Sequence, residues 1–550
     1  MTRLLGIGVG TGSAAGPVAR MSPVPALPAP RPVTDPAAET AAVRAALAAV
    51  VADLTARAAR TDGTAADVLD AQAMMAADPV LADRAADLAA AGTDAPHALT
   101  TAFNGFRAEL LAAGGYFAER VADLDDLRDR AVASALDLPM PGLPEPGHPY
   151  VLVADDLAPA DTALLDPAQV LALITVRGGP TSHTAILAKA LGLPAVVGCA
   201  AAGALAEGRL VLVDGADGVV EADPTEETVR LAAEQERRRR ERLAAVHGPG
   251  RTADGVAVSL LVNLGAPHEL AGAAAADSEG VGLFRTEFLF LDRTEAPGLD
   301  EQTAAYRRVF QAFAGRRVVV RTLDAGADKP LPFATAADEE NPALGIRGLR
   351  TATRDPQLLE TQLAAVAAAA ADATADVWVM APMVSVPAEA AAFAERVRSH
   401  GLPCAGAMIE VPAAALRADR LAEVCDFFSI GTNDLAQYTF AADRTLGALA
   451  DLLDPWQPAL LDLVAATAGA AAEAGRPAGV CGEAAADPEL ALVLVGLGVT
   501  SLSAAPSCLP AVRAALAAVT MDQCRVLAEL ALSAPDAASA RAAVRRHLAE

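Results

Sequence analysis

The chain has 550 residues, which exceeds the length of one ordinary domain. Its apolar content of 53% is ample for more than one hydrophobic core. The formal net charge of -26 argues against nucleic acid or an acidic membrane surface as a partner and favours protein partners. No apolar run reaches membrane-spanning length, the amino terminus lacks the apolar core of a signal peptide, and the six cysteines show no C-x-x-C spacing. We therefore expect a cytoplasmic protein with reduced thiols.

The amino-terminal region combines a short β segment with a long helical one. The first twenty residues predict a strand and a glycine-rich turn, and Pro23 to Pro36 is a proline-rich connector. From about Glu39 to Leu136, apolar residues recur three and four positions apart, which predicts helices. The pattern breaks at Gly63, Asp78-Pro79, Gly92 and Gly114-Gly115, and these breaks fit four helices packed as a bundle.

A β-rich region resumes after the proline and glycine linker Pro139 to Pro149, so the helices interrupt what we expect to be one α/β domain. Its strands are predicted at Tyr150 to Ala154, Val170 to Val176, Ala195 to Val197, Arg209 to Val213 and Gly218 to Glu221. Beyond this domain, Glu226 to His247 predicts a strongly charged helix. A charge run of this kind is typical of a solvated face, here a stalk between two halves of the chain.

His183 lies at a predicted strand-to-helix turn within the block GGPTSHTAILAKALGLPAVVG, residues 178–198. Gly178 and Gly179 allow backbone angles that are closed to other residues, and the first N–H groups of the helix from Thr184 to Leu191 would stabilise an anion. A phosphoryl group on His183 would be such an anion. A capping loop with an incidental histidine is the alternative interpretation.

Beyond Gly250 a strand, a loop and a helix repeat eight times, which predicts a TIM (β/α)8 barrel. The expected strands are Val256 to Asn263, Gly280 to Arg285, Val318 to Leu323, Trp378 to Met383, Cys404 to Glu410, Phe427 to Ile430, Ala478 to Cys481 and Ser501 to Ala504. Polar residues collect at the carboxyl ends of these strands, where barrel enzymes place their active sites. They are Arg285, Glu287, Arg321, Asp324, Glu410, Asn433, Asp434 and Cys481.

The histidine block resembles the phosphohistidine loop of enzyme I, the phosphoenolpyruvate–protein phosphotransferase of the bacterial sugar phosphotransferase system. Pro180 departs from the G-G-R-T-S-H of the familiar enterobacterial enzymes and removes one possible charge partner for a phosphate. Six further blocks resemble the family's barrel segments in family order. They span 280–290, 319–330, 340–348, 406–415, 429–444 and 481–487.

The resemblance implies a multidomain α/β fold: a swivelling phosphohistidine α/β domain with an inserted four-helix bundle, followed by the barrel. The implied boundaries are 1–22 and 146–225 for the phosphohistidine domain and 23–145 for the inserted, phosphocarrier-binding domain. A linker helix would follow at 226–250, and a barrel that binds phosphoenolpyruvate and forms the homodimer at 251–550.

The resemblance also implies a reaction, in which His183 takes the phosphoryl group of phosphoenolpyruvate and pyruvate is released. The substrate's phosphate and carboxylate need forked cationic donors and a hard cation. By this comparison the substrate-binding residues are Arg285, Arg321, Asn433, Arg444 and Arg347. Glu410 and Asp434 would hold Mg²⁺, which usually takes one or two protein carboxylates. Cys481 would protonate the enolpyruvate, and Thr162, whose alternative role is a helix cap, would orient His183.

The implied protein partner is the histidine-containing phosphocarrier protein HPr, docked on the helical insert. The segment Asp70 to Arg84 resembles the family's helix-turn-helix there, and Met74 and Met75 are candidates for an adaptable docking surface. Methionines at helical spacing are more often part of a core, and that interpretation stays ahead here.

Three alternatives remain at this point. A pyruvate phosphate dikinase or phosphoenolpyruvate synthase shares the loop and the barrel, but it needs a large ATP-grasp domain for which too few residues precede the loop. A metal-dependent pyruvyl aldolase could use the barrel alone, yet it would leave His183 and the helical insert without a task. A non-enzymatic signalling scaffold could keep the fold and only bind partners.

Overall fold

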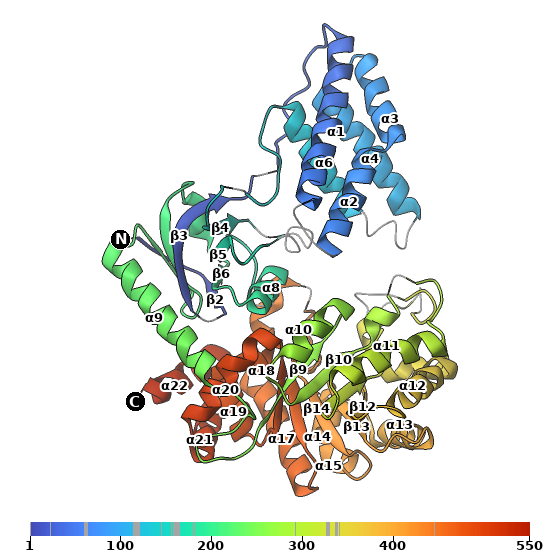
Figure 1. The fold of residues 1–550 in the computed structure, drawn as a ribbon, viewed down its shortest axis with the longest axis vertical. Helices are drawn as coiled ribbons and strands as arrows, with labels where there is room; N and C mark the ends of the chain where they lie inside the picture. Colours follow the sequence, from blue (N-terminus) through green and yellow to red (C-terminus); the bar gives the residue numbers. More distant parts are fainter. Residues whose placement is uncertain are drawn as a thin grey trace. The chain divides into compact units, whose positions relative to one another are not determined.

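The computed structural model describes residues 2–10, 12–22, 24–59, 64–113, 121–144, 146–155, 157, 165–179, 182–291, 293–325, 331–335, 339, 341–444 and 446–549. The chain forms two compact units, Met1–Glu236 and Arg237–Glu550 (Figure 1). Within the described residues, no helix is both long enough and apolar enough to span a membrane.

The first unit contains the predicted helical bundle. Its described helices are α1 (Pro36–Ala58), α2 (Thr64–Ala76), α3 (Pro79–Ala90), α4 (Ala95–Ala113) and α6 (Val121–Ala135). The predicted breaks lie between these helices and separate five segments rather than four. Asp35 caps α1 by accepting hydrogen bonds from the N–H groups of Ala37 and Ala38, and Asp78 caps α3 in the same way. Fully buried side chains such as Leu54 and Leu99 form the bundle's core.

The rest of the first unit is built on an eight-stranded sheet in the order β1-β8-β7-β3-β4-β5-β6-β2. Its strands are β1 (Thr2–Leu5), β2 (Ile7–Val9), β3 (Ser13–Arg20), β4 (Tyr150–Ala154), β5 (Val170–Thr175), β6 (Ala195–Val197), β7 (Leu210–Asp214) and β8 (Val219–Ala222). Those predicted after Pro149 are all present, each end displaced by at most one residue. The amino terminus differs, because it forms three strands where one strand and a turn were expected.

Strand pairing explains how the bundle is attached. β3 and β4 are parallel neighbours, with Val18 opposite Val151, although the whole bundle lies between them in sequence. The bundle is therefore an insertion into the connectivity of the sheet. The described part of this unit also contains a short 3-10 helix, η1 (Ala200–Ala204), and helix α8 (His183–Leu191).

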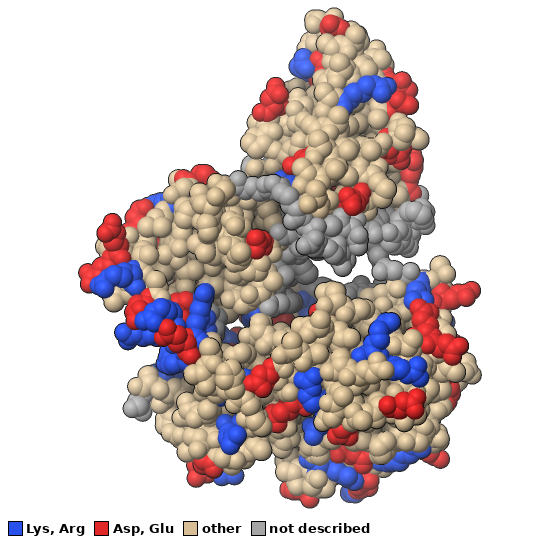
Figure 2. Space-filling view, viewed as in Figure 1, with Lys and Arg blue, Asp and Glu red and all other residues tan. Residues whose placement is uncertain are grey.

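Helix α9 (Glu226–Ala245) follows the sheet and has no buried residue, as its charge run predicts. Acidic side chains flank its run of four arginines, 237–240, and Arg237 pairs with Glu241 one turn later. Figure 2 shows the resulting mixture of both charges along this helix.

The second unit is a closed barrel of eight parallel strands, which confirms the predicted TIM barrel. The strands are β9 (Ser259–Leu264), β10 (Gly280–Arg285), β11 (Arg317–Arg321), β12 (Asp376–Ala381), β13 (Ala405–Ile409), β14 (Phe427–Gly431), β15 (Ala478–Cys481) and β16 (Ser501–Ala504). β16 pairs with β9 and closes the ring. Every predicted strand lies within three residues of its observed bounds.

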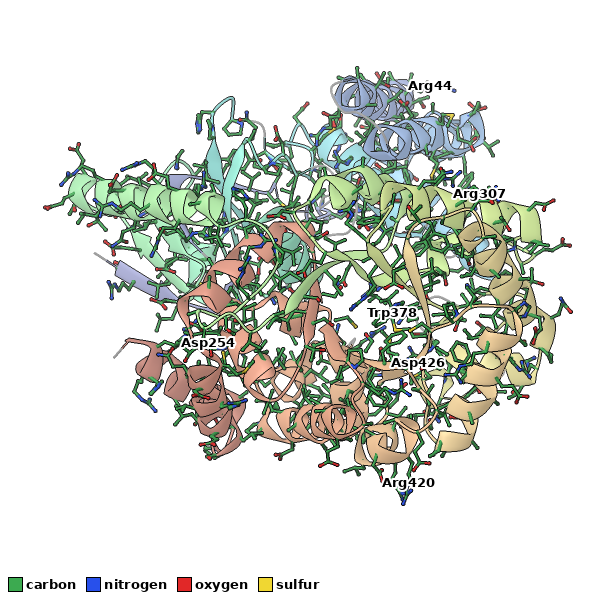
Figure 3. All side chains as sticks on the ribbon, turned by 60° about the horizontal axis from the view of Figure 1, so that its bottom comes forward. Arg44, Asp254, Arg307, Trp378, Arg420 and Asp426 are labelled. Atoms are coloured by element: carbon green, nitrogen blue, oxygen red, sulfur yellow. The ribbon has the colours of Figure 1, made fainter. Side chains whose placement is uncertain are left out.

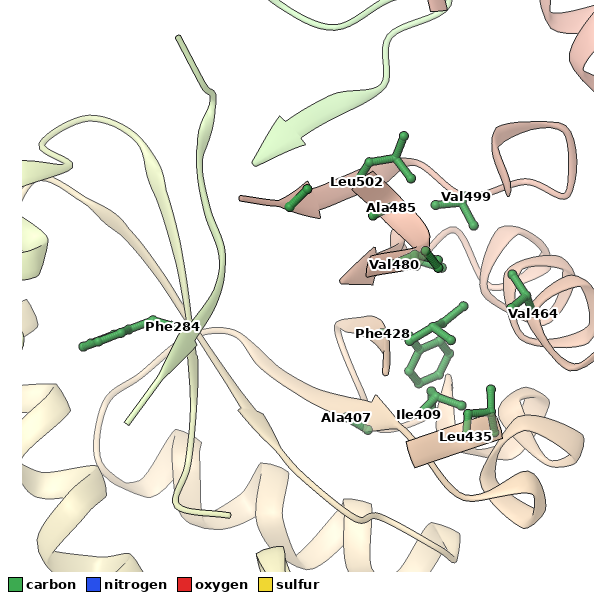
Figure 4. Close-up of a cluster of buried hydrophobic side chains, with 14 of the residues drawn as sticks. Phe284, Ala407, Ile409, Phe428, Leu435, Val464, Val480, Ala485, Val499 and Leu502 are labelled. Carbon is green, nitrogen blue, oxygen red and sulfur yellow. The ribbon is translucent and has the colours of Figure 1, made fainter. Parts of the chain in front are cut away.

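Helices surround the barrel, and apolar side chains fill the layer between them and the strands. The described helices are α10 (Leu270–Ala275), α11 (Leu299–Ala312), α12 (Pro356–Ala370), α13 (Pro387–Ser399), α14 (Pro412–Leu416), α15 (Ala418–Leu421), α16 (Thr432–Phe440), α17 (Pro458–Glu473), α18 (Glu483–Ala486), α19 (Pro488–Gly496), α20 (Leu509–Ala518), α21 (Met521–Leu532) and α22 (Ala537–Ala549). Figure 4 shows Val480 and Phe428 of the strands in a cluster with Val464 of α17. Burial of this layer is the main source of the barrel's stability.

The inside of the ring has its own core, made of Leu283, Val319, Met380, Met408, Phe427 and Cys481. Trp378 packs against it and lies toward the centre of the ring of helices, whereas Arg420 lies at the outer edge (Figure 3). The guanidinium of Arg317 stacks on the Trp378 ring at 3.8 Å from its centroid. Side chains therefore fill most of the interior below the strands' carboxyl ends, apart from a cavity of about 20 Å³ lined in part by Arg317, Trp378 and Phe427.

Gly280 gives a direct test of barrel closure. It begins β10 at φ +138°, and a Cβ atom there would lie 2.1 Å from the carbonyl oxygen of Arg317 on β11. We expect Gly280→Ala to destabilise the second unit by about 3 kcal/mol or more, because strain and a backbone clash coincide. Thermal unfolding measures this. Gly272→Ala is the control, since a Cβ atom there meets nothing within 4 Å, and equal melting temperatures for the two variants would contradict the prediction.

Candidate active site

A cavity of about 210 Å³ opens at the carboxyl ends of the barrel strands. The predicted rim residues that line it are Arg285, Arg321, Arg347, Glu410, Asn433, Asp434, Arg444 and Cys481. Glu287 and Asp324 lie among them. Sites for drug-sized ligands start at about 300 Å³, so this volume suits a smaller molecule. The structure thus brings the predicted barrel residues together in one place.

Arg321 ends β11 and is surrounded by carboxylates. Its guanidinium lies 3.0 Å from Glu287, 3.4 Å from Asp324 and 3.8 Å from Glu410. Burial alone would lower the pKa of Arg321, but these three acids raise it, so the group stays charged. Its buried Nε atom has no hydrogen-bond partner among the described residues. An unpaired buried donor of this kind is unusual in a folded protein.

Arg347 is a second buried guanidinium held by acids. It donates to Asp324 at 2.8 Å and to Asp434 at 3.1 Å, and it also donates to the hydroxyl of Tyr438 at 3.2 Å. Burial opposes its charge, but Asp324 and Asp434 raise its pKa. Asp324 therefore bridges Arg321 and Arg347 and fixes their positions relative to each other.

Glu410 follows β13 and is 1% exposed. Its Oε2 atom accepts a hydrogen bond of 2.9 Å from the backbone N–H of Met383, a residue held at φ +59°. Gly431 faces it, and a Cβ atom there would lie 2.8 Å from Glu410 Cγ. Burial raises the pKa of Glu410, and the nearby Asp434 and Asp324 raise it further, to about 8. Sequence reasoning missed Met383 and Gly431, because one acts through its backbone and the other through a missing side chain.

The donor set fits a single hard cation. Glu410 and Asp434 are both buried, and Asp434 lies on the first turn of α16. The charge of Asp434 raises the pKa of Glu410. A divalent cation would relieve this repulsion, and Mg²⁺ needs only one or two protein carboxylates when substrate and water supply the rest. Within the described part of the chain, no group of three or more His, Cys, Asp or Glu side chains could hold a metal unaided.

The remaining rim residues differ in exposure. Arg285 and Asn433 are exposed, and the side chain of Arg444 is 37% exposed, with Nη1 lying 3.7 Å from Asp434 Oδ2. Cys481 is buried, and its thiol donates to the carbonyl of Ile430 at 3.6 Å. Burial raises the pKa of this thiol above its ordinary value, although a hydrogen bond from Ser429 opposes the shift. Cys481 is therefore a protonated thiol at neutral pH.

His183 begins α8 in the first unit, and the structure describes its backbone but not its side chain. Ser182 caps the helix by accepting a hydrogen bond of 3.3 Å from the N–H of Ala185. Gly178 adopts φ +97°, as expected of a tight glycine turn. Thr162 and Pro180 lie outside the described residues.

Comparison with known proteins places each region in one group of enzymes. Three family models match: "PEP-utilising enzyme, N-terminal" over residues 5–120, "PEP-utilising enzyme, mobile domain" over 146–218, and "PEP-utilising enzyme, PEP-binding domain" over 239–521. The Phosphoenolpyruvate-protein phosphotransferase of Streptomyces coelicolor is 53% identical over 547 residues, covering 98% of each chain.

The chain belongs to the phosphoenolpyruvate–protein phosphotransferase family. The protein of the same name from Haloferax volcanii is 43% identical over 85% of both chains. A Multiphosphoryl transfer protein from Xanthomonas campestris is 41% identical over 88% of this chain and 59% of its own. Membership in this phosphotransferase family confirms the resemblance on which the sequence analysis relied.

The ion pairs of Asp324 predict a pH-dependent stability. Burial would raise its pKa, but Arg321 and Arg347 lower it below the ordinary value, so the ionised group stabilises the fold above about pH 4 and this contribution is lost as the pH falls further. We expect Asp324→Asn to lower the melting temperature at pH 7, with a gap to wild type that narrows between about pH 4.5 and 3. The exposed Asp522→Asn is the control. A gap that is constant with pH would contradict the assignment.

Proposed function

We propose that this protein transfers the phosphoryl group of phosphoenolpyruvate to His183 and then to the histidine-containing phosphocarrier protein HPr, releasing pyruvate. This would be the first step of the sugar phosphotransferase system. The observation that carries the proposal is the small cavity in which buried arginines and a pair of buried acids converge. The transfer by way of His183 is supported by the match of residues 146–218 to a mobile domain and by the position of His183 at the amino terminus of a helix.

Phosphoenolpyruvate suits the cavity in size and charge. It carries a phosphate and a carboxylate on a small enol, and both need cationic donors with a forked geometry. Arg321 and Arg347 would supply buried, preorganised charge, and Arg285, Arg444 and Asn433 would supply donors nearer the mouth. Because Arg321 and Arg347 are already anchored by acids, binding would require little rearrangement of the protein.

Glu410 and Asp434 would hold Mg²⁺. When bound, the cation would neutralise negative charge on the substrate's phosphate. The arginines would then keep the phosphorus in line with a neutral ring nitrogen of His183, which is available near neutral pH because an ordinary imidazole has a pKa of about 6.5.

Cys481 would convert the enolpyruvate left after phosphoryl transfer into pyruvate. Once the phosphoryl group leaves, the enolpyruvate must gain a proton at carbon, and a C–H bond forms as the S–H bond of Cys481 breaks. The raised pKa of this thiol keeps the proton on sulfur until then. Thr162, which lies outside the described residues, would orient His183.

Two separate units imply a conformational cycle, in which His183 is phosphorylated at the barrel and discharged on the carrier. The bundle, within 23–145, would dock the carrier. Residues 1–22 and 146–225 would form the phosphohistidine domain, 226–250 the linker, and 251–550 the barrel and dimerisation domain. Met74 and Val80, at 70% and 65% exposed, support a docking role for the corner between α2 and α3, whereas Met75 packs against the core. A cytoplasmic homodimer completes the proposal.

Substitution of the two reactive residues separates the half-reactions. We expect His183→Ala to abolish phosphorylation by both labelled phosphoenolpyruvate and phosphorylated HPr, because both use the imidazole. Cys481→Ala is expected to slow pyruvate formation by about 100-fold, the lower range for a lost general acid, and to spare phosphoryl return from HPr. Mass spectrometry would locate the acid-labile phosphate on residue 183. Cys508→Ala, outside the cavity, is the control, and unchanged pyruvate formation by Cys481→Ala would rule out its assigned role.

Gly431 tests the metal pair. An alanine Cβ at 2.8 Å from Glu410 Cγ would displace that carboxylate. We expect Gly431→Ala to raise roughly tenfold the Mg²⁺ concentration needed for half-maximal phosphorylation of His183. Gly469→Ala on α17 serves as the control, since a Cβ there meets nothing within 4 Å. An unchanged Mg²⁺ requirement in the first variant would contradict the role of Glu410.

A further inference from the structure

Behind the rim, helix α12 carries a buried glutamine that no part of the proposed reaction uses. Gln362 is 1% exposed, and its amide contacts three different parts of the barrel wall. Its Oε1 atom accepts a hydrogen bond of 2.8 Å from the N–H of Leu323. Its Nε2 atom donates to the hydroxyls of Thr286 and Tyr306, each at 3.0 Å.

The network around Gln362 is closed. Thr286 Oγ1 donates to the carbonyl of Arg321 at 2.9 Å, and the hydroxyl of Tyr306 donates to Gln302 at 3.1 Å. Gln302 in turn donates to the carbonyl of Pro297 at 2.8 Å. The four polar side chains of this network, those of Thr286, Gln302, Tyr306 and Gln362, are at most 1% exposed, so their bonds form away from water. Buried polar groups without a partner are costly, which makes such a network specific in geometry.

The partners of Gln362 are next to the residues that line the cavity. Thr286 directly follows Arg285, and Leu323 lies between Arg321 and Asp324 in sequence. A further bond joins the same two strand ends, because the N–H of Asp324 donates to Glu287 at 3.0 Å. The amide of Gln362 therefore links the ends of β10 and β11 on the side of helix α12. On the side of the cavity, the ion pair of Arg321 with Glu287 links the same two ends.

We propose that Gln362 is a positioning residue, which fixes the ends of β10 and β11 relative to each other and thereby sets the placement of Arg285 and Arg321 for an anionic substrate. The inference rests on the proposed function, because it assumes that these arginines bind phosphoenolpyruvate. An apolar side chain of similar length would fill the space behind the strands, but it would leave the N–H of Leu323 unpaired. It would also remove the link from that strand end to Thr286.

The test compares Gln362→Met with Tyr306→Phe. Both variants break the buried network and lower stability, but only the first releases Leu323 and Thr286. We expect Gln362→Met to raise the KM for phosphoenolpyruvate about tenfold with a smaller change in kcat, and Tyr306→Phe to stay within about twofold of wild type. Pyruvate formation in excess carrier gives both constants, and thermal unfolding measures the stability of each variant.

Phosphoryl transfer from phosphorylated carrier to His183 is an internal control, because it does not involve the barrel arginines. This transfer should proceed at the wild-type rate in Gln362→Met. Thr467→Val is the control for general destabilisation, because it removes a buried hydroxyl whose hydrogen bond within the described residues, to the carbonyl of Leu463, stays inside α17.

Two outcomes would overturn the inference: an unchanged KM in Gln362→Met, or an equal rise in Tyr306→Phe, which would make the network merely structural. Failure of wild-type protein to accept phosphate from phosphoenolpyruvate would instead overturn the proposed function, and the inference with it.

Discussion

The rim of the barrel depends on opposite charges that are buried side by side. Arg321 and Arg347 would be costly to bury alone, and so would Glu410 and Asp434. The two guanidinium groups are tolerated because acids surround them, and Asp324 lies between them. Glu410 has Arg321 nearby, but Asp434 and Asp324 repel its charge. Removal of Arg321 or Arg347 would leave carboxylates uncompensated in a low-dielectric site, so the arginines and their acids depend on one another.

Much of this architecture follows from the sequence. The repeat of strand, loop and helix beyond Gly250 predicts the barrel, because parallel strands buried on both faces read as short apolar runs. Polar residues at the ends of those runs then predict which side chains meet. The bundle was also predictable as helical, and Asp78-Pro79 separates two helices as the sequence indicated, but the four predicted breaks separate five described helices where four were expected.

Other features had no signal in a single sequence. Glu287 and Asp324 were visible at the rim, yet their roles as partners of the arginines depend on distances that only the fold sets. The three strands at the amino terminus depend on pairing with β6, β7 and β8, whose residues are far away in sequence. Gln362 lies in an alanine-rich helix, whose sequence predicts only packing against the barrel. Its three hydrogen-bond partners are distant in sequence, so only the fold brings them together.

The backbone hydrogen bond of Met383 affects which residues related chains could carry at this position. Its contribution to Glu410 is an amide hydrogen of the main chain, oriented by a left-handed backbone rather than by a thioether. Asparagine or glycine reaches that conformation more easily than methionine does. Related chains could therefore exchange the residue at this position freely while the carboxylate keeps its anchor, and a comparison based on side-chain identity would overlook one of the atoms that shape the pocket.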